Sequence, residues 1–477
     1  MSTLKKYLLV VFLASSPFCF SQNPDIKRTY HWYFGNGAGI DFSSGTAVAD
    51  TNGKLHTYEG CTVISDTAGN LLFYTDGDTV WNKNHQSMPN GTGLMGCGNY
   101  GSTAQAALIV PHPENDSLFY IFTNDCWNNN GADGFRYTII NIKLNSGLGD
   151  VISKNNLLFA PSMECVAATK GADGKSVWIL THEYNTSNFL SYKLDSTGLN
   201  ITPMISSIGV PYTDLTAAIK ISPNGKKLAS YSINGITCLN ELYDFDNNTG
   251  LVSNRIGLYT LYCGFYPCFS PDNSKLYFTF GSNYISQFCL TGNNDSVSIS
   301  NTWNVIINNP DSLEDYGQLS IGPDRKIYIA TLWQDSISII NQPNKYGYLS
   351  DVLSKVISLE GKECELGIPN FIDDYFYDST LTAANCDSII GIFENTNSLP
   401  FFIYPNPASQ TIFLYSAISY STNITLKIYN LLGTLIAEQI NYSSFDGISI
   451  SDISNGIYII KIETSTNVYS QKLIINN

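Results

Sequence analysis

Five acidic residues recur at one position of a repeated sequence pattern, and they are the side chains best placed to do chemistry. In four repeats an Asp or Glu stands six to eight places before a tight turn, and a fifth acid holds the matching place in a later segment. These residues are Glu59, Glu164, Asp214, Asp315 and Glu365. Carboxylates brought together repel one another unless a cation offsets their charge. Oxygen ligands in this number suit Ca²⁺ or Mg²⁺ better than zinc, so the pattern predicts a calcium or cationic-ligand site.

A plainer interpretation is that these are loop carboxylates of an acidic chain. The sequence has 40 Asp and Glu against 25 Lys and Arg, a net charge of −15. Acids in exposed loops of such a chain point outward and bind nothing. The sequence leaves both interpretations open.

A repeated hairpin pattern positions these acids. A short apolar strand is followed by a turn rich in Pro, Asp, Asn and Gly, and then by a second aromatic strand. The clearest turns are residues 171–175, 222–226, 270–273 and 322–326, and degenerate copies precede Leu71 and Leu118. Pro presets the turn dihedral while Asp, Asn and Gly supply the bend, so each copy predicts a β-hairpin.

A third strand and usually a weaker fourth follow each hairpin, which gives six units with a period near fifty residues. Such a repeat predicts an all-β protein with a β-propeller, whose innermost strands line a central channel. The five acids would then stand at one mouth of that channel. Segment 364–371 is expected to be a further innermost strand, and residues 31–35 and 39–42 to be outer strands. Joined, they would close a seven-bladed ring; a six-bladed ring with both ends as decoration is the alternative.

Four motifs near the C-terminus occur in a fixed order. Residues 401–408 read FFIYPNPA, residues 428–433 read IYNLLG, residues 453–461 read ISNGIYIIK, and residues 471–475 read QKLII. This ordered set resembles the C-terminal sorting domain, type A-like, of the type IX secretion system. The resemblance implies recognition by the type IX secretion machinery and transfer to the cell surface or the medium. It also implies a small β-sandwich at 401–477, behind a linker at 379–400.

The N-terminus agrees with export. Lys5 and Lys6 precede an apolar run and then small and polar residues, which is the layout of a signal peptide at 1–21. The propeller would then span 22–378. No later segment is apolar enough to span a bilayer, so a transmembrane anchor is not expected. Removal of the signal peptide takes away two lysines and leaves a net charge of −17. That charge disfavours nucleic acid and anionic membranes as partners.

Ten cysteines remain after removal of the signal peptide, an even number in a chain that passes through an oxidising compartment. Cys97 and Cys126 are the pair we expect to form a disulfide. Both lie in Gly- and Asn-rich loops that open on the same face of the predicted propeller, where a crosslink would restrain them.

The front of the chain resembles exported propeller proteins of gliding and surface-associated bacteria. The residues that carry the resemblance are WYFG at 32–35, AGIDF at 38–42, LFYTDG at 72–77 and MPNG at 88–91. The family is largely without assigned activity, so the resemblance supports the fold and implies little chemistry.

No catalytic motif stands out, and catalytic residues and cofactors stay unknown at this stage. The five histidines show no metal-ligand spacing, and His182 is expected to be a hydrogen-bonded structural histidine in a strand. We therefore favour a surface protein that binds a glycan or protein ligand without catalysis. The alternative is a metal-assisted hydrolase or lactonase at the channel mouth. Carboxylates within reach of one ion would favour the enzyme, and a rim of exposed aromatic residues would favour the binding protein.

Overall fold

The computed structural model describes most of the chain between Asn23 and Asn476. The described residues are 23–97, 102–258, 263–280, 284–308, 315–386, 401–404, 406–416, 424–442, 447–464 and 468–476. The predicted signal peptide and residues 387–400 of the predicted linker lie outside them.

Seven antiparallel sheets are found among the described residues before position 387. The first two have three strands each: β1 (His31–Phe34), β2 (Ala38–Asp41) and β3 (Val48–Ala49), then β4 (Thr62–Ser65), β5 (Leu71–Thr75) and β6 (Val80–Asn82).

Five larger sheets follow in chain order. The third contains β7 (Ala107–Pro111), β8 (Leu118–Thr123), β9 (Phe135–Asn141) and β10 (Asp150–Phe159). The fourth contains β11 (Ala167–Lys170), β12 (Val177–His182), β13 (Asn188–Asp195), β14 (Gly198–Leu199) and β15 (Met204–Ser207). The fifth contains β16 (Ala218–Ile221), β17 (Lys227–Asn234), β18 (Thr237–Asp246) and β19 (Leu251–Gly257). The sixth contains β20 (Gly264–Phe269), β21 (Lys275–Phe280), β22 (Tyr284–Cys289) and β23 (Asn304–Asn308). The seventh contains β24 (Tyr316–Ile321), β25 (Ile327–Thr331), β26 (Ser336–Ile340) and β27 (Val352–Ser358).

The predicted hairpin turns share one hydrogen-bond scheme. In each of the four clear copies the Asp or Asn at the third position accepts a bond from the backbone N–H two residues later, as Asp173 does from Lys175 at 2.9 Å. The following residue adopts a positive φ, which Gly174 and Gly225 reach without a steric penalty. Side chains of Asp and Asn therefore fix the turn, as their enrichment there indicated.

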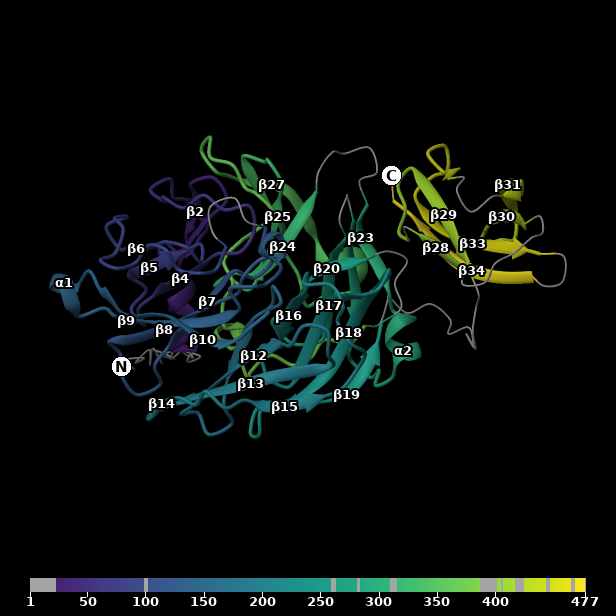
Figure 1. The fold of residues 1–477 in the computed structure, drawn as a ribbon. Helices are drawn as coiled ribbons and strands as arrows, with labels where there is room; N and C mark the ends of the chain where they lie inside the picture. Colours follow the sequence, from purple (N-terminus) through teal and green to yellow (C-terminus); the bar gives the residue numbers. More distant parts are fainter. Residues whose placement is uncertain are drawn as a thin grey trace, which may run out of the picture.

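The sheets are arranged as a propeller, with inner strands side by side around an axis. β4 contacts β7, β11 contacts β16, and β20 contacts both β16 and β24. Figure 1 shows the sheets following one another around this axis in chain order. The inner strands β4, β16 and β24 are buried along their whole length, whereas the outer strand β27 is mostly exposed.

The two ends of the propeller meet in one hydrophobic core. Trp32 of the first sheet packs against Tyr328 of β25 and against Phe371, with ring centroids 5.1 and 5.7 Å apart. The first sheet thus lies between the β24–β27 sheet and the β4–β6 sheet, since β1 contacts β4 and β3 contacts β27.

The expected innermost strand at 364–371 is not a strand in the structure. This segment forms only isolated bridges, from Glu363 to Asn36 and from Cys364 to Gln334. It nevertheless occupies the predicted place, because Leu366 donates its N–H to Tyr58 at 2.9 Å and accepts one from Gln318 at 2.8 Å. This segment bridges neighbouring sheets and forms no strand pairing with β1. Because it does not complete the first sheet as an inner strand, the number of complete blades stays a prediction.

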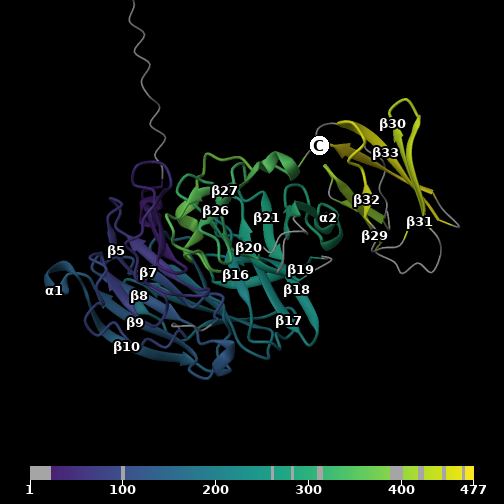
Figure 2. The same ribbon diagram turned by 90° about the horizontal axis from the view of Figure 1, so that it is seen from above.

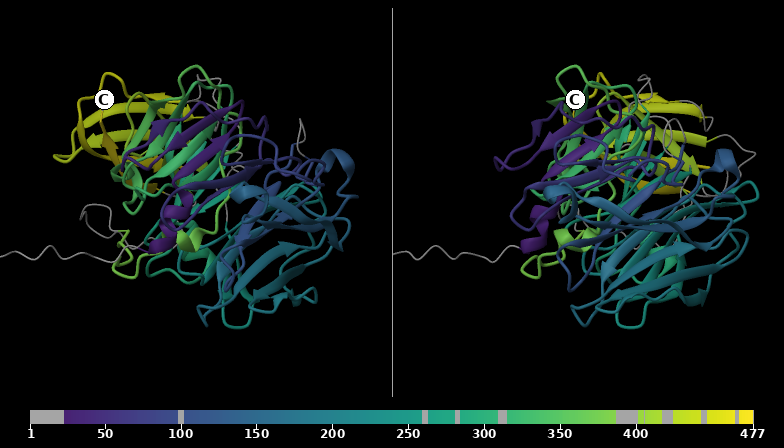
Figure 3. Two further views of the ribbon diagram at one scale, coloured as in Figure 1. Left: turned by 90° about the vertical axis from the view of Figure 1, so that its left-hand side faces the viewer. Right: turned by 60° about the vertical axis from the view of Figure 1, so that its left-hand side comes forward.

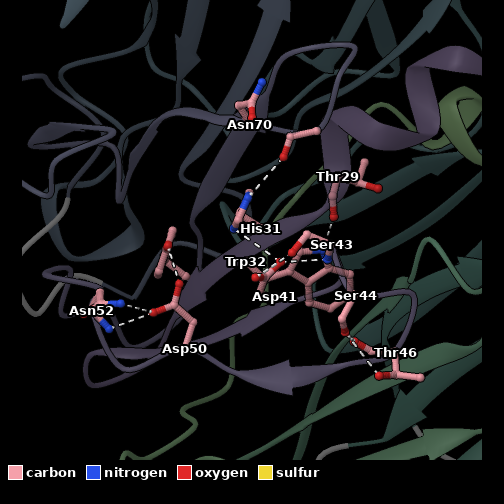
Figure 4. A network of polar contacts seen from close by, with 12 residues as sticks. Thr29, His31, Trp32, Asp41, Ser43, Ser44, Thr46, Asp50, Asn52 and Asn70 are labelled. Atoms are coloured by element: carbon pink, nitrogen blue, oxygen red, sulfur yellow. Dashed lines mark hydrogen bonds and ion pairs between the residues drawn. The ribbon is translucent and has the colours of Figure 1, made fainter.

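Side-chain hydrogen bonds hold the first sheet in place (Figure 4). The Trp32 indole donates to the Thr29 carbonyl at 2.9 Å, and the His31 ring lies between the Gly69 carbonyl and Asp41. Asp50 accepts bonds from both Asn52 and Tyr33. These contacts tie the N-terminal strands to the next sheet and to their own loops.

Three disulfides occur among the described cysteines. They join Cys97 to Cys126, Cys238 to Cys263 and Cys289 to Cys386. The first is the expected pair. Cys61, Cys165, Cys268 and Cys364 are free and buried.

The Cys289–Cys386 disulfide fixes the start of the predicted linker to the propeller. Ala384 also donates its N–H to Asp272 at 2.8 Å and accepts a bond from Lys275 at 2.9 Å. Ala384 and Cys386, which fall within the predicted linker, are therefore attached to the propeller.

The C-terminal domain is a small β-sandwich with its own core. One sheet contains β28 (Phe401–Tyr404), β29 (Thr411–Ser416) and β32 (Ile448–Ser449), and the other contains β30 (Ile424–Asn430), β31 (Leu435–Tyr442), β33 (Gly456–Glu463) and β34 (Val468–Ile475). Ile412 and Leu414 of the first sheet pack with Leu426, Ile460 and Leu473 of the second. Figure 2 shows this domain, in yellow, to one side of the propeller.

The described helices are short. They are η1 (Pro24–Thr29), η2 (Trp127–Asn129), α1 (Leu144–Gly147), α2 (Ser296–Ser300), η3 (Gly347–Ser350) and η4 (Asp373–Phe376). None of these is long and apolar enough to cross a membrane.

Candidate functional site

The five predicted acids lie at one end of the propeller axis, which we call the mouth. Four of them precede inner strands: Glu59 before β4, Glu164 before β11, Asp214 before β16 and Asp315 before β24. Glu365 lies in the segment that joins the two ends of the propeller. Because the inner strands run in one sense, their beginnings share one face, and the hairpin turns lie on the opposite one.

Glu59 is buried and is hydrogen-bonded from two other parts of the ring. The hydroxyl of Tyr266, on β20, donates to Oε1 at 2.6 Å, and the hydroxyl of Ser102 donates to Oε2 at 2.8 Å. Burial raises the pKa of Glu59, although both hydrogen bonds act in the opposite direction. The carboxyl group thus connects sheets that are far apart in sequence.

Glu164 is also buried, and its carboxyl accepts backbone hydrogen bonds. The N–H of Trp127 donates to Oε1 at 2.6 Å and that of Ala104 donates to Oε2 at 3.3 Å. Burial is the main reason that the pKa of Glu164 rises to about 8, and the charges of Glu59 and Asp214 raise it further. Glu164 is therefore mostly protonated at neutral pH.

Tyr58 lies near three acids of the mouth. Burial is the main cause that raises its pKa, and the negative charges of Glu59, Glu365 and Asp315 raise it further. Tyr58 and Glu365 also line a small pocket of about 90 Å³ at the edge of the mouth. Oε2 of Glu365 is buried and makes no hydrogen bond with a described residue, and burial raises the pKa of this carboxyl.

The carboxylates share a face without converging on one point. No three of the five acids place ligand oxygens within 4.8 Å of one another. The one described group that meets this distance is Asp125 with Cys97 and Cys126, whose sulfurs form a disulfide. A calcium ion at the mouth would need movement of the side chains, so calcium binding there stays a prediction.

Polar side chains fill the channel beneath the mouth. The side-chain amide of Gln105 donates to the Ile219 carbonyl at 2.9 Å, and the Gln318 amide donates to the Ala104 carbonyl. Lys220 reaches Asn370 at 3.0 Å and pairs with Asp373 at 3.3 Å. A cavity of about 20 Å³ lies among these residues and has room for about one water molecule.

Three exposed apolar side chains surround the mouth, and we call them the rim. They are Trp127, Ile236 and Trp333, and Trp127 and Trp333 are 58% and 68% exposed. Each lies between the second and third strands of its sheet, which places it on the mouth face. The repeat pattern in the sequence does not point to them. The available signal was a bulky apolar residue inside a polar turn, as in Cys126-Trp127-Asn128.

Backbone contacts hold each rim residue beside an acid of the mouth. The N–H of Trp127 is bonded to Glu164. Trp333 has a φ of 56°, and its neighbours Leu332 and Gln334 bond to the backbones of Asp315 and Cys364. A large residue in the left-handed region is uncommon and often marks a functional site.

The loop of Ile236 is fixed in the same way. Gly235 donates its N–H to the Thr213 hydroxyl at 2.7 Å, one residue before Asp214. The disulfides Cys97–Cys126 and Cys238–Cys263 also lie in these loops. The rim is therefore fixed in position before any ligand arrives.

His182 differs from its expected role. It is buried in β12 and stacks on Tyr212 with ring centroids 3.9 Å apart, but neither ring nitrogen makes a hydrogen bond with a described residue. Burial lowers its pKa to about 3. The residue is packed as a neutral aromatic ring and takes no part in the mouth.

Comparison with known proteins identifies the C-terminal domain. Residues 402–476 match the family model for the secretion system C-terminal sorting domain. The protein is exported. The sorting domain sends it to the cell surface or the medium and implies recognition by the type IX secretion machinery. No curated protein matches the chain.

Solved structures that resemble the propeller are distant. A candidate 6-phosphogluconolactonase from Bacteroides uniformis is 13% identical, with 71% of this chain and 98% of that chain covered and a TM-score of 0.43. A quinoprotein alcohol dehydrogenase-like protein from Bacteroides thetaiotaomicron is 13% identical, with coverages of 72% and 76% and a TM-score of 0.38. TolB from Acinetobacter baumannii is 14% identical, with coverages of 71% and 82% and a TM-score of 0.32. All three TM-scores are below 0.5.

Proposed function

We propose that this exported protein binds a surface glycan with the mouth face of its propeller and does not catalyse a reaction. The observation that carries the proposal is the rim of exposed Trp127 and Trp333 beside hydrogen-bonded acids. Exposed aromatic residues on a rigid surface supply binding energy at a low cost in conformational entropy.

The chemistry of the face suits sugars. Tryptophan rings offer flat apolar surfaces to the faces of sugar rings, and the carboxyl groups of the mouth offer acceptors to hydroxyl groups. The cavity lined by Gln105 and Gln318 is too small for a sugar, so we propose that the ligand lies across the face. A protein ligand would use the same aromatic anchors, and the experiment below separates the two.

The alternative is a metal-assisted hydrolase or lactonase. Crowding of the acids favours it, because the charges of Glu59 and Asp214 raise the pKa of Glu164. Bound Ca²⁺ would relieve that repulsion and raise the melting temperature, and Glu164→Gln with Asp214→Asn would abolish the rise. The separation of the carboxylate oxygens makes this the second choice.

The test is a glycan array probed with the mature protein, alongside a panel of surface proteins on the same slide. We expect selective binding to one glycan class, with at least a tenfold loss of affinity in a double variant of Trp127→Ala and Trp333→Ala. Ile201→Ala is the control, because Ile201 is 64% exposed in the loop between β14 and β15, which is not one of the rim loops. Selective binding to proteins only, or equal losses in the control, would overturn the proposal.

A further inference from the structure

We infer that a second binding site, for a small anion of the carboxylate or phosphate type, lies on the hairpin face of the propeller. The site is a cleft of about 370 Å³ at the junction of the two chain ends, here called the junction cleft. Its volume lies within the range of small-molecule sites.

Four segments from distant parts of the chain form the junction cleft. η1 supplies Asp25 and Arg28, η4 and the residue before it supply Tyr375 and Ile372, the β7–β8 turn supplies residues 111–113 and Asp116, and the β11–β12 turn supplies Lys175 with its neighbours. Figure 3 shows η1, in purple, beside η4, in green, and the two helices are in contact.

The charged groups of the junction cleft are close to balance. Three basic side chains, Arg28, Lys170 and Lys175, line it with two acidic ones, Asp25 and Asp116, and Asp374 lies 3.8 Å from Lys170. The groups that an anion could use are therefore those that these carboxylates leave unpaired.

Asp25 is already paired and offers little to a ligand. Its Oδ1 lies 2.7 Å from Nε of Arg28 and its Oδ2 lies 2.7 Å from Nζ of Lys170. Lys170 also lies 3.8 Å from Asp374 and over the ring of Tyr375. This network holds two cations firmly at the base of the junction cleft.

Two further donors have no competing partner. Lys175 is exposed, and its Nζ makes no ion pair with a described residue. Nδ1 of His112 accepts the N–H of Glu114 at 3.2 Å, so the neutral ring carries its proton on Nε2 and can donate it. An anion in the junction cleft would satisfy both groups.

Apolar side chains line the walls. Pro111, Pro113, Ile372 and Tyr375 leave room for a ring or a short chain attached to the anionic group. We therefore expect the anionic group to be carried on an organic ring or chain, as in an acidic monosaccharide.

The experiment is isothermal titration calorimetry of the mature protein with glucuronate, with glucose as its neutral counterpart, and with inorganic phosphate. Glucuronate is expected to bind and glucose to bind at least tenfold more weakly. Lys175→Ala should weaken glucuronate binding at least fivefold. The matched control is Lys226→Ala, because Lys226 occupies the equivalent exposed position of the next hairpin and does not line the junction cleft.

Each outcome decides the inference. The inference is supported if an anion binds and glucose does not, and if Lys175→Ala weakens the binding of the anion while Lys226→Ala does not. The phosphate titration then shows whether the anionic group alone is recognised. Both variants change exposed side chains, so loss of folding does not complicate the result. Equal affinity for glucose and glucuronate, no binding of either anion at millimolar concentration, or equal losses in the two variants would overturn it.

Discussion

The hydroxyl of Tyr266 donates a 2.6 Å hydrogen bond to Glu59, across 207 positions of sequence. This bond joins the sheet of β20 to the loop before β4 at the floor of the mouth. Its length is typical of a hydroxyl that donates to an ionised carboxylate. This hydrogen bond therefore affects both the stability of the propeller and the charge of Glu59 at the mouth.

Tyr266→Phe should destabilise the propeller in a pH-dependent way. Loss of a donor to a buried carboxylate costs about 1–3 kcal/mol of unfolding free energy. The hydrogen bond lowers the pKa of Glu59, so its removal raises that pKa and makes the loss larger at pH 8 than at pH 5. Urea unfolding at both pH values measures this. Ser102→Ala, which removes the other donor, should act in the same direction, and a loss of equal size at both pH values would contradict the assignment.

Glu164→Gln should flatten the stability profile between pH 4.5 and 8. The pKa of Glu164 is about 8 in the folded chain and 4.5 ordinarily, so the folded chain binds more protons in this range. The free energy of unfolding of the wild type therefore falls as the pH rises. The neutral glutamine removes this contribution, so, relative to their difference at pH 4.5, the variant should gain on the order of 4 kcal/mol over the wild type by pH 8. Thermal unfolding across the range is the measurement, and a variant that tracks the wild type would refute the expectation.

His182→Phe should protect the protein against acid. The pKa of His182 falls from 6.5 to about 3 on folding, so the unfolded chain binds more protons between these values. The contribution of His182 to the free energy of unfolding is fully present above pH 6.5 and is lost as the pH falls toward 3. The phenylalanine variant should exceed the wild type by on the order of 2 kcal/mol at pH 4.5. His56→Phe is the control, since His56 is exposed, and it should leave the acid limb unchanged.

A chain that ends at Cys386 should be more stable than one that ends at Asp378. The shorter chain loses the Cys289–Cys386 disulfide and the contacts of Ala384, which together cost about 2–4 kcal/mol. Both chains lack the sorting domain and should stay in the periplasm as folded propellers. Unfolding midpoints and cell fractionation test the two statements. Surface display of either chain would contradict the role of the sorting domain, and equal midpoints would contradict the attachment at Cys386.

The repeat could be predicted because its turns are local. An Asp or Asn that accepts a bond from the backbone N–H two residues later requires only neighbouring residues, so Asp173 and Asp272 are informative without any structure. The position of the acids follows from the same repeat. Glu59 and Glu164 do lie on one face, since inner strands that run in one sense begin at one end.

Side-chain reach and long-range contacts could not be predicted in this way. Whether Glu59 contacts Glu164 or Tyr266 depends on loop paths that no single repeat contains. The segment at 364–371 shows the same limit, because its backbone bonds to Tyr58 and Gln318 come from two different sheets. Trp333 was overlooked because its exposure, and not its type, distinguishes it from the core aromatic residues.

The disulfide between Cys289 and Cys386 also fixes where the described chain leaves the propeller. Cys289 lies opposite Lys275 in the strand register, directly after a hairpin turn, so this exit is on the face opposite the mouth. An attachment made through the C-terminal end therefore starts from the face that does not carry Trp127 and Trp333. Proteolytic removal of the tail beyond Cys386 would release the propeller with its last segment still fastened and its binding face intact.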